Sequence, residues 1–337
     1  MNGAKKAGTQ SITFANPPVI TNWSNMVGPM EGEGPYGTEF DWILEDYLFG
    51  EETWEKAEAK MLRETVKMVV GKANLSLPDI EVLLAGDLLN QLISANYAAR
   101  ELKIPFLGLY GACSTMSEGT ALAAMLVDGG FYQRVAVGVT SHHYTAERQF
   151  RFPTEQGTQR SPSAQWTVTG CGSVIIQASG SGPRITSATI GKVVDLGQSD
   201  VNDMGSAMAP AAVDTIVTHF QDMGRTPDYY DLIITGDLGK YGLAAAEALS
   251  MKYGYPVESG RMVDCGVIIY KPEQDAHAGG SGCGCSAAMF CGPILNRMRD
   301  GQYHRVLLVA TGALMSPTST LQGESIPCIA HAVAVEN

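Results

Sequence analysis

The chain repeats itself, and this internal repeat restricts the fold more than any other feature of the sequence. IEVLLAGDLLN at residues 80–90 is similar to YDLIITGDLGK at residues 230–240. Each segment is an apolar run that ends in Gly-Asp-Leu, so Asp87 and Asp237 take equivalent places 150 residues apart. Each also follows a Pro-Asp pair, which is typical of a turn that enters a strand.

A second pair of similar segments follows in the same order. DGGFYQRVAVGVT at residues 128–140 is similar to RDGQYHRVLLVAT at residues 299–311, with an offset of 171 residues. At this offset, Gly-Ala-Cys-Ser at 111–114 falls on Gly-Cys-Gly-Cys at 282–285. The sequence therefore predicts two halves of one order, which differ by an insertion of about 21 residues.

The segments between the repeats indicate the class of fold. Strands such as VLLAG and RVLLVAT are continuous apolar runs, which is typical of sheets covered on both faces. Residues 120–127 carry no charge and predict a helix buried between layers. The matching helix, at about 286–298, contains Pro293, so we expect it to be bent or to start late. The expected fold is α/β with five αβαβα layers, formed by halves at residues 1–182 and 183–337.

Composition excludes several classes of function. The chain has 337 residues, 35 of them acidic and 23 basic, for a net charge of −12 that disfavours nucleic acid and anionic lipid as partners. Seven cysteines with no apolar leader indicate an intracellular protein with free thiols. Cys283, Cys285 and Cys291 match no zinc spacing, so we expect no metal site and no cofactor. No apolar run reaches the length of a membrane span.

One cysteine stands out by its place in the chain. Cys113 lies in LYGACSTMSEGTALAAML, between an apolar run and the helix predicted to be buried. A thiol at a helix N-terminus faces unpaired N–H groups and the positive end of the helix dipole, which lower its pKa and can hold an oxyanion. Cys113 is therefore a candidate nucleophile, with an inert core thiol as the alternative.

These motifs resemble known families. GACST at a junction of strand and buried helix resembles the thiolase superfamily, which includes thiolases and ketoacyl synthases. IPCIAHAVAV places Cys328 at the second thiolase cysteine. GDLLNQ, AERQFRFPTE, DMGSAMAPAA, AGGSGCGCSA and ESIPCIAH together resemble the stage V sporulation protein AD family of spore-forming bacteria. The resemblance implies a thiolase-like αβαβα fold.

The resemblance also implies a function. The family serves the uptake of dipicolinic acid (pyridine-2,6-dicarboxylate) into the developing spore. Its members are expected to bind this ligand, as the free acid or as its calcium chelate. The expected partners are other proteins of the stage V sporulation A system, which would hold a soluble chain at the forespore and spore inner membrane. A homodimer is expected as well.

The chain departs from the superfamily pattern where the enzymes hold their catalytic partners. Gly236 occupies the position of the expected histidine, Asp237 follows it, and Ser281 occupies the position of the second partner. A general acid–base group contributes roughly 10²- to 10⁴-fold to rate, so this departure implies that condensing activity is lost. An anionic Asp237 would also oppose formation of a Cys113 thiolate. His277 and His331 are near enough in sequence to replace the missing partners.

The expected ligand site follows from the same alignment and from the cationic and aromatic segment SHHYTAERQFRFP. The candidate ligand-binding residues are Cys113, Asp87, His142, Arg148, Arg151, Asp237, His277, Ser281, Cys328 and His331. For Arg148 and Arg151 a role as surface charges is the alternative, and for both aspartates a role in strand-end turns. Two other functions stay open: an acyl-CoA-dependent condensing or acyl-transferring enzyme that uses Cys113, and a structural subunit. Residues 24–50 are a further loop or docking surface.

Overall fold

The computed structural model describes residues 5–150 and 160–337. Its long sheet divides at the single pairing of Arg184 with Val19 into two five-stranded parts, which we call the first and second sheets and which have the same order and directions of strands. The first sheet runs β3 (Val19–Val27), β9 (Gly170–Gln177), β7 (Arg134–Ser141), β5 (Val82–Gly86) and β6 (Phe106–Gly108). The second runs β10 (Arg184–Thr189), β15 (Cys328–Glu336), β14 (Arg305–Ala313), β11 (Leu232–Thr235) and β12 (Met262–Asp264). In each sheet the last three strands are parallel and the first two antiparallel, which confirms the predicted repeat of the fold.

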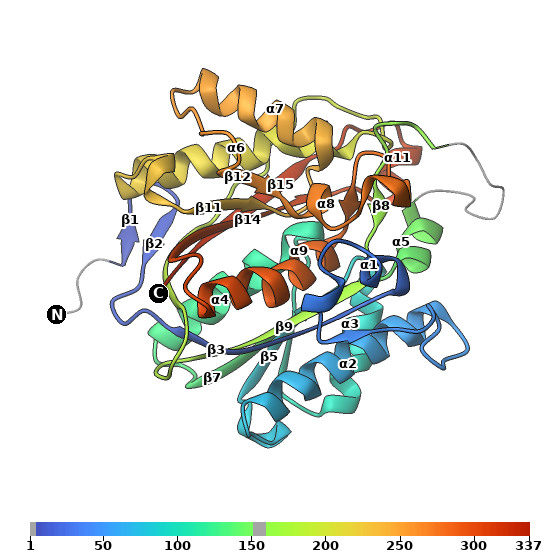
Figure 1. Cartoon of the computed structure of the whole chain (residues 1–337), viewed down its shortest axis with the longest axis vertical. Helices are drawn as coiled ribbons and strands as arrows, with labels where there is room; N and C mark the ends of the chain where they lie inside the picture. The colour runs from blue at the N-terminus through green and yellow to red at the C-terminus, as the bar shows by residue number, and fades with distance from the viewer. Residues whose placement is uncertain (1–4, 151–159) are drawn as a thin grey trace.

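Helices lie on both sides of the two sheets and between them (Figure 1). The outer helices are α2 (Trp54–Lys72) and α3 (Ile93–Leu102) on the first sheet, and α6 (Met204–Met223) and α7 (Gly239–Lys252) on the second. The inner helices are α4 (Thr115–Asp128) and α9 (Cys283–Met289). This arrangement is the predicted αβαβα sequence of layers, and the structural relatives described below share it.

The short elements connect these layers. The short helices are α1 (Pro29–Gly32), α5 (His143–Phe150), α8 (Cys265–Ile268), α10 (Leu295–Arg299) and α11 (Pro317–Leu321). The short strands are β1 (Lys6–Ala7), β2 (Ser11–Thr13), β4 (Trp42–Ile43), β8 (Trp166–Thr167) and β13 (Gly280–Ser281). Strands β8 and β13 pair with each other in parallel and border the site described below.

The second inner helix differs from its expected form. We expected it to start late or to bend at Pro293, and it begins at Cys283 instead of near residue 286. The bend is present, because Phe290–Ile294 forms a π-helical turn around Pro293 before α10 begins. A proline inside a helix removes one N–H donor and crowds the preceding turn, and a wider turn accommodates both effects.

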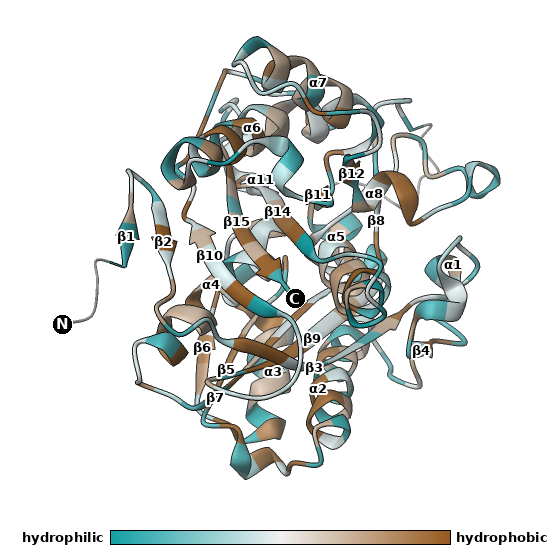
Figure 2. Ribbon diagram, turned by 60° about the vertical axis from the view of Figure 1, so that its left-hand side comes forward, coloured by the Kyte–Doolittle hydropathy of each residue, from teal (hydrophilic) through white to brown (hydrophobic). Residues whose placement is uncertain are grey.

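The outer helices show why the sequence takes this arrangement. Helix α2 starts at Thr53, whose hydroxyl accepts a hydrogen bond from Lys56 N at 3.3 Å. Its buried positions follow helical spacing and pack on the first sheet: Ala57, Met61, Leu62, Thr65, Val66, Val69 and Val70. Figure 2 shows mostly white to brown colour along the strands and much of the teal in the outer loops and helices.

In each half, an acidic residue at the start of one repeated strand forms hydrogen bonds with the backbone at the start of the neighbouring parallel strand. Glu81, before β5, accepts hydrogen bonds from the backbone N–H groups of Gln133 and Arg134 at the start of β7. Asp231, before β11, accepts from the backbone of His304 and Arg305 at 2.7 and 2.9 Å. The acidic residue that opens each repeated segment therefore fixes the register of two parallel neighbours.

The structure also describes the state of the cysteines, the grouping of possible metal ligands and the character of the helices. All seven cysteines are free thiols, and Cys283, Cys285 and Cys291 are fully buried. Within residues 5–150 and 160–337, no three His, Cys, Asp or Glu side chains lie together in a way that could hold a metal ion. In the same residues, no helix has both the length and the apolar character that a membrane crossing needs.

Close packing of the inner helix on the first sheet gives a stability prediction. A Cβ on Gly172 of β9 would lie 2.2 Å from the carbonyl oxygen of Ala287 in α9, so Gly172→Ala must displace the helix. We expect a loss of roughly 1 to 3 kcal/mol in the free energy of unfolding, measured by urea denaturation.

The matched control for this experiment is Gly71→Ala in α2, where no atom lies within 4 Å of the new Cβ. This change should raise the free energy of unfolding by roughly 0.5 to 1 kcal/mol, because alanine is the better helix former. Equal effects of the two substitutions would contradict close packing between α9 and β9.

Candidate functional site

A small pocket, with a cavity volume of about 40 Å³, lies where the two halves meet, at the N-terminus of α4. Its lining is mainly apolar, and the polar groups gather around Cys113, Asp237 and Ser281. The lining residues are Leu88, Tyr110, Ala112, Cys113, Ala146, Glu147, Phe150, Thr167, Met204, Met208, Asp237, Ser281, Ala313 and Met315. A concave, mostly apolar cavity with a few converging polar groups is the usual form of a small-molecule site.

Cys113 lies in the turn that leads into α4, and its surroundings hold it in one position. Ala112, the preceding residue, has a φ of 49°, a left-handed conformation that a residue with a side chain seldom adopts. Gly312 of β14 packs against this turn so closely that a Cβ there would lie 2.2 Å from the Gly111 oxygen. The thiol is half-buried and faces the pocket.

Asp237 lies beside this thiol and is fully buried. Its Oδ2 atom accepts hydrogen bonds from Gly282 N at 3.0 Å and from Ser281 Oγ at 3.3 Å. Its Oδ1 atom accepts from Thr311 Oγ1 at 3.1 Å, and the Cys113 thiol donates to the same carboxyl group. Thus Asp237 is the centre of a polar cluster to which β13, β14 and the turn before α4 all contribute.

Burial decides the protonation of both groups. It raises the pKa of Asp237 to about 7, an increase that the hydrogen bonds from Cys113, Gly282 and Thr311 oppose. Burial also raises the pKa of the Cys113 thiol well above its ordinary value, and the neighbouring Asp237 carboxylate adds to this increase. The favourable effect of the helix N-terminus is therefore outweighed, and Cys113 is a neutral thiol at pH 7.

The two equivalent aspartates have different roles. Asp87 accepts hydrogen bonds from Leu89 N and Ala95 N, both at 2.7 Å, and caps the loop after β5. In the second half Asp264 takes this role, since its carboxylate accepts from Leu238 N at 2.8 Å. Asp237 is thereby free to face the pocket, while Asp87 has the turn-forming role that we considered as its alternative.

Glu147 of α5 forms a second acidic point of the lining. Thr167 Oγ1 donates to its carboxylate at 3.2 Å, and Arg160 Nη2 lies 3.6 Å from the same oxygen. Arg160 also lies over the ring of Trp166, with the guanidinium carbon 4.8 Å from the centroid. The Arg160 guanidinium group is therefore held beside the pocket by its ion pair with Glu147.

Several predicted site residues lie outside the lining. His142 is buried with Nε2 2.8 Å from the carbonyl oxygen of Tyr47. His331 lies in β15, where its Nδ1 accepts a hydrogen bond from Gly191 N at 3.2 Å. Cys328 is buried at the start of the same strand. The structure does not bring these three side chains to the pocket.

The remaining predicted residues are likewise not in the lining. Arg148 is half-exposed on α5, where it pairs with Glu55. His277 lies beside Asp275 near the surface, with Nε2 4.0 Å from its carboxylate. Arg151 lies outside the described residues. His277 and His331, which we considered as replacements for the expected catalytic partners, are not among the residues that line the pocket.

Sequence reasoning missed several lining residues. Met204 and Met208 lie in DMGSAMAPAA, a segment quoted for its resemblance but not examined for chemistry. Glu147 lies in AERQFRFPTE, where attention went to the arginines. For Tyr110 the signal was its place three residues before Cys113. Met315 had no signal in the sequence, because only the fold brings the end of β14 to the pocket.

The arrangement limits the chemistry of the pocket. Among the described residues that line it, none is a histidine, asparagine, lysine or arginine. Gly236 occupies the expected histidine position. A Cβ added to it would lie 3.3 Å from the Ala310 Cα, so a larger side chain has little room there. The pocket offers a neutral thiol, a carboxyl group that titrates near neutrality and an apolar cavity.

Solved structures with the same fold are condensing enzymes. The 3-oxoacyl-[acyl-carrier-protein] synthase III of Aquifex aeolicus superposes with a TM-score of 0.58 at 11% identity, covering 95% of this chain and all of that one. OleA of Xanthomonas campestris with bound lauric acid and lauroyl-CoA gives a TM-score of 0.63 at 11% identity, covering 95% and 99% of the two chains. These likenesses establish a thiolase-like fold.

Sequence comparison is more specific. The chain is 49% identical to stage V sporulation protein AD of Bacillus subtilis (strain 168) over 332 residues, which is 98% of each chain. Residues 8–336 match the family described as Stage V sporulation protein AD (SpoVAD). With its thiolase-like fold and its pocket at the junction of the halves, the chain belongs to the stage V sporulation protein AD family.

Proposed function

We propose that this sporulation protein binds dipicolinic acid in the pocket around Cys113 and Asp237, and that binding serves uptake of the acid into the developing spore. The observation that carries the proposal is a mainly apolar pocket whose described lining residues include no histidine, asparagine, lysine or arginine. A pocket that keeps ordered polar groups but lacks the expected histidine and asparagine partners is suited to binding rather than to condensation.

The lining matches the two parts of the ligand. Phe150, Met208 and Met315 offer apolar surface for a flat pyridine ring. At the polar end, a protonated Asp237 is a donor for a ligand carboxylate. Ionised Asp237 would repel the free dianion, whereas the calcium chelate is neutral and would not be repelled. The proposal therefore covers both species, each under its own conditions of pH.

The alternative function is an acyl-CoA-dependent enzyme that forms an acyl thioester on Cys113. The related fold of condensing enzymes favours it. Against it stand the raised thiol pKa and the replacement of the expected histidine and asparagine partners by Gly236 and Ser281. We propose no cofactor. Partners in our proposal are other stage V sporulation A proteins, which hold the chain at the spore inner membrane.

We also propose a homodimer that forms through strand β6. This strand is at the edge of the first sheet, where its outer backbone groups have no neighbouring strand among the described residues. Leu107 is 50% exposed and Tyr110, which also lines the pocket, is 43% exposed. An exposed apolar edge strand is suited to pairing with the same strand of a second copy.

The first prediction concerns the pH dependence of ligand binding. Because a ligand carboxylate needs the protonated form of Asp237, affinity for free dipicolinate should fall as pH rises through about 7, by up to roughly tenfold per unit. Calorimetric titration at about pH 6.5, 7.5 and 8.5 measures this. Asp237→Asn should bind with a much flatter pH profile.

The controls for this titration are calcium and an isomeric ligand. With calcium present the wild-type profile should flatten, since the chelate is neutral. Pyridine-3,5-dicarboxylate should not bind, and Cys113→Ala should still bind dipicolinate. Absence of heat with both forms of the ligand would refute the binding proposal, and a requirement for the Cys113 sulfur would favour the enzyme alternative.

The second prediction concerns the thiol. Iodoacetamide should modify Cys113 much more slowly than free cysteine at about pH 8, because its pKa is raised. Asp237→Asn should increase this rate by at least about threefold, since it removes the repulsive carboxylate. Peptide mass spectrometry gives the rates and also detects acylation after exposure to acyl-CoA. An acyl group on wild-type Cys113 would support the enzyme alternative.

The third prediction tests the dimer. Leu107→Lys places a charge on the exposed face of β6 and should convert the dimer to a monomer in sedimentation velocity experiments. Phe131→Lys, at a residue that is 76% exposed elsewhere on the surface, is the matched control and should leave the dimer intact. A wild-type chain that sediments as a monomer would rule out this interface.

A further inference from the structure

The loop that precedes α2 exposes apolar side chains among acidic ones. Its sequence, DWILEDYLFGEE at residues 41–52, holds five carboxylates and no basic residue. Trp42 is 42% exposed, and Ile43 and Leu48 are each 40% exposed. We refer to residues 41–52 as the acidic apolar loop. Large apolar side chains grouped at a surface commonly mark an interaction site.

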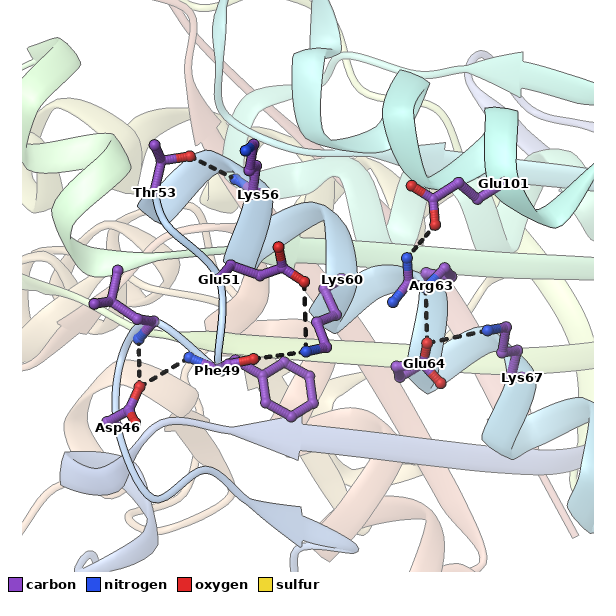
Figure 3. Close-up of polar contacts among 11 residues, drawn as sticks. Asp46, Phe49, Glu51, Thr53, Lys56, Lys60, Arg63, Glu64, Lys67 and Glu101 are labelled. Atoms are coloured by element: carbon purple, nitrogen blue, oxygen red, sulfur yellow. Dashed lines mark hydrogen bonds and ion pairs between the residues drawn. The ribbon is translucent and has the colours of Figure 1, made fainter.

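The acidic apolar loop is held in a fixed conformation, as Figure 3 shows in part. Asp46 Oδ1 accepts hydrogen bonds from Leu48 N at 2.7 Å and Phe49 N at 2.8 Å. Lys60 of α2 donates to the Phe49 carbonyl at 2.7 Å, and its Nζ lies 4.4 Å from the Phe49 ring centroid. The Phe49 ring meets Trp42 edge to face at 5.3 Å. The exposed side chains are thus presented by an ordered surface, which lowers the entropic cost of binding.

The charges of the loop are only partly neutralised. Asp41, Glu51 and Glu52 each pair with a lysine of α2, at nitrogen–oxygen distances of 2.7, 3.4 and 2.8 Å. Glu45 and Asp46 have no ion pair within the described residues. Negative charge therefore remains beside Trp42 and Leu48.

We propose that the acidic apolar loop docks a segment of another protein that carries both basic and apolar side chains. Basic side chains complement Glu45 and Asp46, and apolar side chains cover Trp42, Ile43 and Leu48. An anionic membrane surface would be repelled by the same carboxylates. A second copy would bring a net charge of −12 and an identical acidic loop, so it is a poor occupant.

Docking at this loop would also act on the pocket, because the inner side of the loop contacts α5. The Tyr47 carbonyl oxygen lies 2.8 Å from His142 Nε2, and the Tyr47 ring meets Tyr144 at 5.1 Å. Trp54, just after the loop, stacks on Tyr144 at 4.7 Å. Helix α5 supplies Ala146, Glu147 and Phe150 to the pocket. This proposal does not depend on which ligand the pocket binds.

Site-directed photo-crosslinking in sporulating cells tests the proposal. A benzophenone side chain replaces Trp42 in the full-length chain, or Met251 as a control position that is 66% exposed. The adduct at position 42 is identified by peptide mass spectrometry. We expect a peptide of another protein with more Lys and Arg than Asp and Glu. A peptide of this same chain, a lipid, an acidic peptide, or no adduct beyond that at position 251 would overturn the proposal.

A charge variant makes the test specific. Glu45→Lys with Asp46→Asn removes the two unpaired charges, while the amide introduced by the second substitution retains an acceptor for the loop. This variant should lower the yield of the adduct at least fivefold. Glu247→Lys with Glu273→Gln makes the same change of net charge at exposed residues elsewhere. This control should alter the yield less than twofold. Equal losses in both variants would mean that net charge alone drives the contact, and would also overturn the proposal.

Discussion

The fold depends on two inner helices, α4 and α9, packed between the two sheets. Such packing requires backbone to approach backbone, and glycines make this possible at Gly172 against α9 and Gly312 against the turn before α4. The same packing brings the start of α4 close to the ends of β11 and β14. The pocket is therefore a direct consequence of the layer arrangement.

What differs between binding and catalysis in this fold is a small number of side chains. Cys113 keeps the place that suits a nucleophile, but its polar neighbour is a carboxyl group instead of an imidazole. Asp264 takes over the capping of the second-half turn, so Asp237 can face the cavity. The repeated Gly-Asp turn thus contains one aspartate that caps a loop and another that lines the pocket.

Much of this could be predicted from the sequence, since the repeated Gly-Asp segments and the uncharged helix are local signals. They predicted the repeated order of strands, the buried helix and the neighbourhood of Cys113 and Asp237. They could not place His142, His331 or Cys328, because which face of a strand or turn meets the cavity depends on register. Met315 was missed for a similar reason, because the fold alone brings it to the pocket.

The buried carboxyl groups have one more consequence. Burial raises the pKa of Glu31 and Asp237 to about 7 and that of Asp87 to about 6, and it also raises the pKa of Glu58 and Asp264. The formal charge of −12 counts all of these groups as ionised. Folding therefore takes up protons between about pH 4 and 7, and the contribution of these groups to the free energy of unfolding falls as the solution becomes more alkaline across that range. At neutral pH the folded chain therefore carries less negative charge than its composition implies, and its electrophoretic mobility is lower than that expected from a charge of −12.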